Sequence, residues 1–124
     1  GFGLGLDLTL RDVQTQLKER LEPWERAKAF DGACPVSGFV EVGKSDLDDL
    51  SFSLEINGET RQSGHTAKMM KSVEQLMIEI SQCFTLLPGD IVMTGTPRGV
   101  GPLYSGYKLK LTLDQHFSIE TQIA

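Results

Sequence analysis

Four polar side chains in the first quarter of the chain are of types that bind small carboxylic or carbonyl compounds. The first, Asp7, lies within the apolar stretch 2–8, where a carboxylate must be neutralised, hydrogen-bonded or bound to a cation. It is either a structural cap for the helix that follows or a ligand of a hard divalent cation such as Mg²⁺, which takes oxygen ligands. The local sequence leaves both interpretations open.

The other three side chains could bind an anion or a developing negative charge. Lys28 lies between two alanines in a stretch of little other polarity, so it is either solvated or placed to stabilise an enolate or carboxylate. Arg11 and Gln14 are three residues apart and share one face of an expected helix. Both types can bind a carboxylate or a carbonyl, although the two could equally be the solvated side of that helix.

A glycine-rich loop in the second half of the chain is a further candidate site. Residues 91–93 form an apolar run that predicts a buried strand, and a turn at 88–90 precedes it. Residues 94–102 then contain three glycines and two prolines, which allow close backbone approach and fix the loop's shape. The loop lacks the Gly-Lys-Ser/Thr of a phosphate-binding loop. It is either a small-molecule site or a structural turn.

The remaining reactive residue types offer less. His65 and His116 have no partner at metal-ligand spacing, and we expect both to be surface residues. Cys34 and Cys83 also lack metal-type spacing, so we expect reduced core thiols rather than a disulfide. The sequence contains no Gly-x-Ser-x-Gly nucleophile motif.

Two helices and about six strands should position these candidates. Residues 2–8 predict a strand, and Thr9 is a candidate N-cap for a helix whose apolar face is Leu10, Val13, Leu17 and Leu21. Pro23 should stop this helix, and residues 24–30 could form one further short turn. Residues 43–50 read as a polar, acidic surface connection.

The second half of the chain is dominated by strand patterns. Apolar residues alternate over 52–56, and Asn57-Gly58 predicts a hairpin turn with a return strand over 59–64. Ser72 and Gln75 form a capping-box pattern before a second amphipathic helix. Alternation returns over 109–113 and 117–123, separated by a turn. The fold class is therefore β-rich α+β.

Composition points to one globular domain over residues 1–124. The chain has 124 residues, 40% of them hydrophobic and 23% charged, with a formal net charge of −5. That charge argues against nucleic acid and anionic membrane as partners. No apolar run approaches the roughly 18 residues of a membrane span, and we expect a cytoplasmic protein. Because Gly1 opens inside an expected strand without an initiator Met, we also expect that an N-terminal portion is missing.

Three groups of residues, taken together, resemble the fumarylacetoacetate hydrolase family. They are 6–14 (LDLTLRDVQ), 27–30 (AKAF), and 85–90 (TLLPGD) with 94–97 (TGTP) and 99–102 (GVGP). The stretch 34–37 (CPVS) and the Asn57-Gly58 hairpin are similar to the small acylpyruvase-like branch. The resemblance covers nearly the whole chain.

The resemblance implies a fold, a cofactor and roles for individual residues. The family fold is a mixed β-roll with few helices, usually assembled as a homodimer that binds Mg²⁺, or Mn²⁺ or Ca²⁺. Asp7 is then one metal ligand, while Arg11, Gln14, Lys28 and Thr96 face the substrate and Lys28 stabilises the developing oxyanion. The family's other two metal ligands are glutamates upstream of Gly1, and its catalytic His and Glu lie further upstream still.

The implied activity is divalent-metal-dependent hydrolysis of a C–C bond in a small acylpyruvate-type 2-oxo acid. The motifs are shared with 2-oxo acid decarboxylases of the oxaloacetate type and with isomerases of hydroxymuconate-like diacids, which remain alternatives. An alternative from a different class is a non-catalytic fragment that supplies only an oligomer surface.

Overall fold

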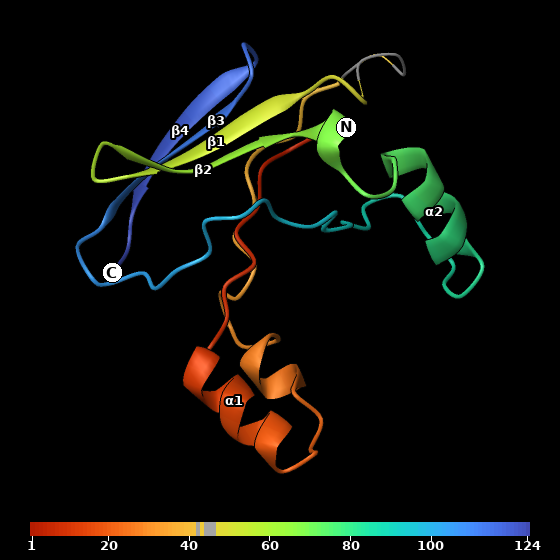
Figure 1. Cartoon of the computed structure of the whole chain (residues 1–124). Coiled ribbons are helices and arrows are strands. Elements are labelled where there is room, and N and C mark those ends of the chain that lie inside the picture. Colours follow the sequence, from red (N-terminus) through yellow and green to blue (C-terminus); the bar gives the residue numbers. More distant parts are fainter. Residues whose placement is uncertain (42, 44–46) are drawn as a thin grey trace. The chain divides into compact units, whose positions relative to one another are not determined.

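The computed structural model describes residues 1–41, 43 and 47–124, which divide into two compact units (Figure 1). Residues 3–38 form the first, here called the N-terminal unit. Residues 1–2 together with 39–124 form the second, here called the sheet unit.

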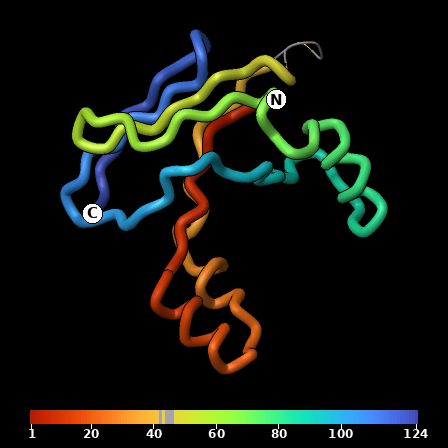
Figure 2. The backbone as a smooth tube through the Cα atoms, viewed as in Figure 1, coloured from red at the N-terminus to blue at the C-terminus, as the bar shows by residue number. Residues whose placement is uncertain are grey.

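The N-terminal unit begins as two extended segments that run side by side (Figure 2). The Leu6 N–H donates to the Pro35 carbonyl at 3.0 Å, and the Leu8 N–H donates to the Ala33 carbonyl at 2.9 Å. The strand predicted over 2–8 is nevertheless reduced to isolated bridges. Pro35 has no N–H to donate, and the Leu4 N–H donates to Ser37 Oγ, so a regular ladder cannot form.

Helix α1, Arg11–Glu19, follows this pair of segments. Its N-cap is Leu10 and makes no side-chain capping bond, so the prediction of a Thr9 cap is wrong. Leu17 is buried as predicted, but Leu21 is 94% exposed. Leu21 lies beyond the end of the helix at a φ of +56°, which turns it away from the apolar face.

A short helical turn completes the N-terminal unit. It is η1, Glu25–Ala27, and it confirms the turn expected within 24–30. The Leu10 N–H donates to the Ala27 carbonyl at 3.0 Å, and Ala27 is completely buried. This bond joins the start of α1 to the end of η1, so the residues that follow each of them, Arg11 and Lys28, begin from neighbouring backbone positions.

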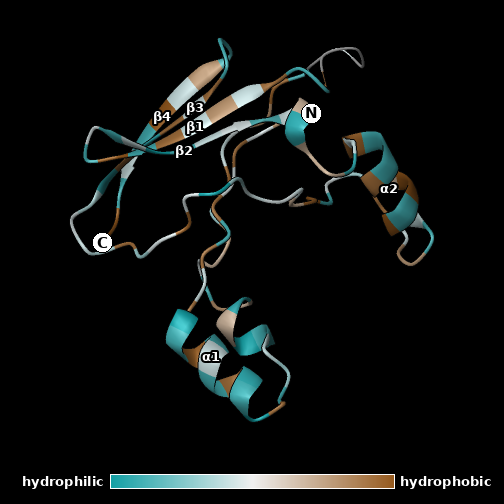
Figure 3. Cartoon of the chain, viewed as in Figure 1, coloured by the Kyte–Doolittle hydropathy of each residue, from teal (hydrophilic) through white to brown (hydrophobic). Residues whose placement is uncertain are grey.

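The sheet unit is built on four antiparallel strands in the order β2-β1-β3-β4. They are β1 Ser51–Ile56, β2 Glu59–His65, β3 Lys108–Leu113 and β4 Phe117–Gln122. Hydrophobic and hydrophilic residues alternate along β1, β3 and β4, which is the pattern that predicted these three strands (Figure 3), whereas β2 was predicted as the return strand of the hairpin. Asn57 and Gly58 both have positive φ angles, as a tight two-residue hairpin requires. Leu54, Leu109 and Leu113 are the buried residues of this sheet.

The pairing between β1 and β2 contains an irregularity. Leu54 pairs with Gln62, but the next residue, Glu55, pairs with Thr60. Arg61 is therefore one extra residue on β2, as in a β-bulge. Such an irregularity changes the directions of neighbouring side chains, which matters for the loop described below.

The predicted second helix is present with its cap. Helix α2, Val73–Ser81, follows the short turn η3, Thr66–Lys68. Ser72 Oγ accepts from the Gln75 N–H at 3.2 Å, and Gln75 Oε1 accepts from the Ser72 N–H at 3.1 Å. This is the reciprocal capping box that the sequence predicted.

The chain from 82 to 107 contains no helix or strand, so the buried strand predicted over 91–93 is wrong. Ile91 is 50% exposed and Met93 is 43% exposed. Among the described residues, no neighbouring segment pairs with this run, and apolar character alone cannot form a ladder. The turn before it is confirmed, because the Asp90 N–H donates to the Leu87 carbonyl at 3.0 Å. Within the described residues there are four strands where about six were expected, and the α+β class is confirmed.

Three smaller expectations also need comment. Leu50, within the expected surface connection 43–50, is buried, while positions 44–46 of that connection lie outside the described residues. Cys34 and Cys83 are free thiols, but both are exposed, so the expectation of core thiols is wrong. No helix in the described part of the chain is long and apolar enough to span a membrane.

Candidate functional site

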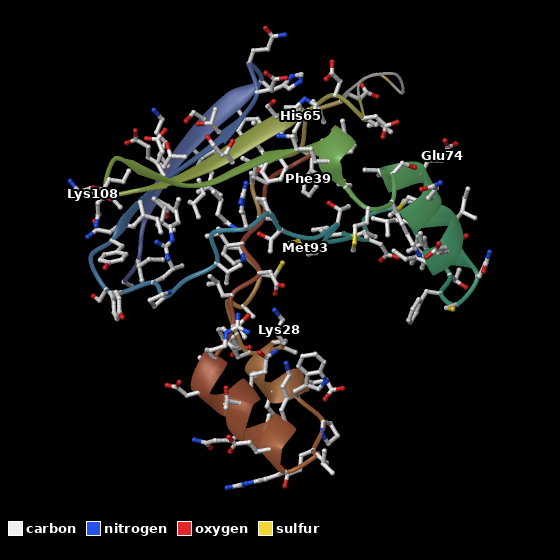
Figure 4. All side chains as sticks on the ribbon, in the orientation of Figure 1. Lys28, Phe39, His65, Glu74, Met93 and Lys108 are labelled. Carbon is white, nitrogen blue, oxygen red and sulfur yellow. The ribbon has the colours of Figure 1, made fainter. Side chains whose placement is uncertain are left out.

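The first cluster of functional side chains lies in the N-terminal unit and is centred on Lys28, labelled in Figure 4. Lys28 Nζ forms an ion pair with Asp7 Oδ1 and donates a hydrogen bond to Thr9 Oγ1 at 2.9 Å. The side chain of Lys28 is 34% exposed and that of Asp7 is 53% exposed. The ammonium group is thus held in place by two partners but remains accessible to a ligand.

The backbone pairing of the unit explains why these residues meet. Asp7 and Thr9 flank Leu8, whose N–H donates to the Ala33 carbonyl, and Lys28 comes directly after the buried Ala27. Asp7 does not cap α1, since that helix has no side-chain capping bond. The capping interpretation of Asp7 is therefore wrong, and the carboxylate instead faces a cation.

A second polar pair begins on the same helix. Arg11 Nη1 donates to Gln14 Oε1 at 2.7 Å. Gln14 is only 5% exposed, so it is not part of a solvated face, whereas Arg11 is exposed. A guanidinium has five N–H donors, and this bond occupies one of them. Gln14 therefore orients Arg11 while leaving donors that could bind a carboxylate.

The third group lies in the sheet unit and comprises the glycine loop, residues 94–102, together with β2. Gln62 Nε2 donates to Thr96 Oγ1 at 2.9 Å and to the Pro97 carbonyl at 3.0 Å. Arg61 Nε donates to the Gly99 carbonyl at 3.1 Å. In a regular strand, the side chains of residues 61 and 62 would point to opposite faces. Because Arg61 is the extra residue on β2, both can reach the same loop.

Two glycines let the glycine loop approach β2 so closely. Gly99 has a φ of +108°, and a Cβ there would run into the Arg61 carbonyl oxygen. A Cβ at Gly101 would meet the Arg61 guanidinium. These contacts explain why the loop is glycine-rich, without any ligand being needed for the explanation.

The donor groups present fit a metal ion only in part. Asp7 offers a carboxylate that is half exposed, which suits one oxygen ligand of a hard cation. No group of three His, Cys, Asp or Glu residues placed to hold a metal is found within residues 1–41, 43 and 47–124. The described residues thus offer one suitable carboxylate but no complete metal centre.

The histidines do not contribute to these clusters. His65 Nε2 lies 3.3 Å from Asp49 Oδ1, and its Nδ1 accepts from the Ala67 N–H at 3.2 Å. His116 is exposed, in the turn between β3 and β4.

Sequence reasoning missed Thr9 and Gln62 as members of these clusters. Thr9 had a usable signal, because its hydroxyl is two residues from Asp7 and alternation along an extended segment puts both side chains on one side. Gln62 had none, since Thr96 lies 34 residues further along the chain and the reach of Gln62 to it depends on the register irregularity at the neighbouring Arg61.

The chain is similar to proteins of a known family. The model of the fumarylacetoacetate (FAA) hydrolase C-terminal family matches residues 1–123. The oxaloacetate tautomerase YcgM of Escherichia coli is 50% identical over 125 residues, covering 99% of this chain and 57% of the relative. The family resemblance inferred from the motifs is thereby confirmed.

Solved structures agree on the fold. A fumarylacetoacetate hydrolase family protein of Yersinia pestis matches with a TM-score of 0.93 and 49% identity, over 100% of this chain and 57% of that one. The fumarylpyruvate hydrolase of Pseudomonas aeruginosa, solved with Mn²⁺ and pyruvate, matches with a TM-score of 0.91 and 33% identity, over 100% of this chain and 54% of that one. The chain therefore spans a little over half the length of these proteins, and its fold class is confirmed.

Proposed function

Because this chain belongs to the fumarylacetoacetate hydrolase family, we propose that the protein acts on small 2-oxo acids by stabilising an enolate. The first candidate reaction is keto–enol tautomerisation of an oxaloacetate-like diacid. The tautomerase of Escherichia coli supports this choice over hydrolysis, since its identity to this chain is 50% and that of the fumarylpyruvate hydrolase is 33%.

The observation that carries the proposal is the position of Lys28. In tautomerisation, the C–H bond beside the keto group breaks, the proton leaves, and the electron pair moves toward the keto oxygen, which later takes up a proton. Charge develops on that oxygen, and a fixed, accessible ammonium group stabilises it without reorganising. The Lys28 Nζ is bound by Asp7 and Thr9, and the Lys28 side chain is one-third exposed, which supports this role.

The remaining residues are proposed to bind and orient the substrate. Arg11, held by Gln14, presents guanidinium donors that suit a substrate carboxylate. Arg11 directly follows Leu10, whose N–H donates to the carbonyl of Ala27, the residue before Lys28. Arg11 and Lys28 therefore start from neighbouring backbone positions. Thr96 of the sheet unit is proposed as a further substrate-binding residue.

We further propose that a divalent cation takes part, with Asp7 as one of its ligands. Mg²⁺ is the proposed ion, with Mn²⁺ or Ca²⁺ as alternatives, and the Mn²⁺ in the fumarylpyruvate hydrolase structure supports a divalent metal in general. Such an ion would act as a Lewis acid on the substrate's keto oxygen.

The second candidate is hydrolysis of a C–C bond in an acylpyruvate. The pyruvate in the fumarylpyruvate hydrolase structure favours it, because pyruvate has the 2-oxo acid unit that such a cleavage releases as an enolate. The same Lys28 and Arg11 roles would serve both reactions. Decarboxylation of an oxaloacetate-like acid also passes through an enolate, so it stays a further alternative.

One experiment separates these candidates. The purified protein, with Mg²⁺, is given enol oxaloacetate and fumarylpyruvate in turn, and loss of the enol absorbance and release of pyruvate are measured. Faster conversion of enol to keto oxaloacetate, without cleavage of fumarylpyruvate, is the expected result. Pyruvate release from fumarylpyruvate would select the hydrolase, and inactivity on both acids would contradict the proposal.

The exposed apolar residues and the net charge bear on assembly and location. We propose a homodimer, and the exposure of Phe84, Leu87 and Val100 at 68%, 63% and 61% supports a surface that another subunit covers. A monomer in sedimentation experiments would contradict it. The net charge of −5 supports the absence of nucleic-acid and anionic-membrane partners, and the cytoplasmic location stays a prediction.

A further inference from the structure

The hydrogen bonds around Thr96 determine whether its hydroxyl group acts as a donor or as an acceptor. Gln62 Nε2 lies within hydrogen-bond distance of both Thr96 Oγ1 and the Pro97 carbonyl. A carbonyl oxygen can only accept, so the NH₂ end of the Gln62 amide must face Pro97. The opposite amide orientation would bring two oxygen acceptors together.

This orientation has a consequence for the threonine. An NH₂ group can only donate, so Thr96 Oγ1 is the acceptor in its bond with Gln62. The two N–H groups of the amide are then shared between Thr96 and Pro97, one each. No other partner of the Thr96 hydroxyl occurs among the residues that the structure describes, so its own proton is not committed. A hydroxyl that accepts one hydrogen bond also becomes a better donor of the next.

We infer that Gln62 is a positioning residue that makes Thr96 a hydrogen-bond donor toward a substrate oxygen. The inference rests on the proposed function, in which Thr96 binds the substrate. It names the atom that donates and the residue that sets the direction. Arg61 supports the same arrangement, because its Nε donates to the Gly99 carbonyl and holds this part of the glycine loop against β2.

The chemistry identifies what the hydroxyl recognises. An uncommitted O–H suits an oxygen that gains negative charge during the reaction, such as the keto oxygen of a 2-oxo acid as it becomes an enolate. Because Thr96 Oγ1 already accepts one hydrogen bond while its proton is uncommitted, donation is the stronger interaction that it offers. This favours an oxyanion over a cation as the ligand.

The test uses isosteric changes at Gln62 in the whole protein. Gln62→Glu keeps the shape of the side chain but replaces its two N–H donors with a carboxylate acceptor. The Thr96 hydroxyl would then donate to this carboxylate and could no longer donate to the substrate. We expect kcat to fall about tenfold while KM changes less than about threefold, the pattern of an interaction made mainly in the transition state. Gln115→Glu, the same charge change in the exposed turn after β3, should leave both constants unchanged.

A double-mutant cycle shows whether Gln62 acts through Thr96. If it does, Gln62→Leu and Thr96→Val should each lower kcat, and the double variant should be no slower than Thr96→Val alone. Additive losses, or a Gln62→Glu enzyme within twofold of wild type in kcat, would overturn the inference. Retention of activity by Thr96→Ser, which keeps the hydroxyl, is the expected rescue.

A readout independent of turnover separates this inference from the proposed function. Amide hydrogen exchange of residues 95, 96, 98 and 99 should speed up in Gln62→Leu but not in Gln115→Glu, because only the first loses the bonds to Thr96 and Pro97. If the wild-type protein turns over no 2-oxo acid, the proposed function fails. In that case, unchanged exchange in Gln62→Leu would also overturn the positioning role, and faster exchange would preserve it.

Discussion

The Lys28 cluster and the glycine loop hold their functional groups in different ways. In the N-terminal unit, Asp7 and Thr9 hold Lys28 through direct contacts between charged and polar side chains. In the sheet unit, Thr96 is held by the neutral side chain of Gln62 from β2, and the glycine loop that contains Thr96 approaches β2 closely at Gly99. The first arrangement positions the charged ammonium group of Lys28. The second positions the backbone of the glycine loop and the hydroxyl group of Thr96. Changes in the two regions should therefore have different kinds of effect.

The largest effect should come from removing the charge of the first region. Lys28→Met keeps much of the apolar stem and deletes the ammonium group. We expect kcat to fall about a hundredfold, equivalent to roughly 3 kcal/mol of transition-state stabilisation, by analogy with the loss of an oxyanion-stabilising donor. Steady-state kinetics of the protein measure this loss.

The control for Lys28→Met is Lys68→Met, at an exposed residue of η3, which should leave kcat unchanged. The Lys28–Asp7 pair is partly exposed, so its loss should change the free energy of unfolding by no more than about 1 kcal/mol. Unchanged kcat with lowered stability would mean that Lys28 only packs against its neighbours.

The next largest effect should be on stability and should come from the glycine loop. Gly99→Ala places a Cβ against the Arg61 carbonyl oxygen at a φ of +108°. We expect the free energy of unfolding to fall by about 2 kcal/mol, from backbone strain and lost contacts with β2. Urea denaturation of the protein measures this change.

Gly106→Ala is the matched control for the backbone strain. Gly106 also has a positive φ, +86°, but a Cβ there would meet nothing within 4 Å. The difference between the two variants therefore isolates the cost of close approach. Equal losses of stability would show that the loop does not depend on its contact with β2.

A smaller effect on substrate binding should follow from Gln14→Leu. This change removes the acceptor that orients Arg11 and keeps the buried position apolar. We expect KM for the 2-oxo acid to rise about tenfold with a smaller change in kcat, because a carboxylate contact is present in both ground and transition states. Gln16→Leu, at an exposed position of the same helix, should change neither constant. A fall in kcat without a rise in KM would contradict a binding role.

The smallest effect should be that of Mg²⁺ on the 124-residue chain itself. Asp7 is the one ligand that we propose within this chain, and one carboxylate does not offset the dehydration of this ion. Calorimetry should find a Kd no tighter than about 10⁻⁴ M, the weak range of carboxylate-bound divalent cations. A tighter site that disappears in Asp7→Asn would show that the chain holds a complete metal centre.

Features that depend on local sequence signals could be predicted, and features that depend on pairing between distant segments could not. Strand alternation, the Asn57-Gly58 hairpin and the Ser72 capping box are local signals, and the structure confirms all three. The extended segment 2–8 and the apolar run 91–93 were predicted as strands from the same kind of signal. Neither is one, because a strand also needs a partner that can complete its hydrogen bonds, which a local pattern cannot supply.

The candidate site shows the same limit. Asp7, Arg11, Gln14 and Lys28 were identifiable from residue type and motif order, and the structure joins them in two pairs. The burial of Gln14 and the contact of Thr9 with Lys28 needed the backbone pairing of the unit. The link from Gln62 to Thr96 needed the extra residue on β2, which changes side-chain direction without any mark in the sequence.

Exchange of the methyl protons of pyruvate in D₂O tests the central claim, that Lys28 stabilises an enolate, most directly. Proton NMR follows the loss of the methyl signal with wild-type protein and with Lys28→Met, each in the presence of Mg²⁺. The account predicts that wild type accelerates exchange over buffer and that Lys28→Met reduces this acceleration about a hundredfold. Equal exchange rates for the two proteins, or no acceleration by wild type, would contradict it.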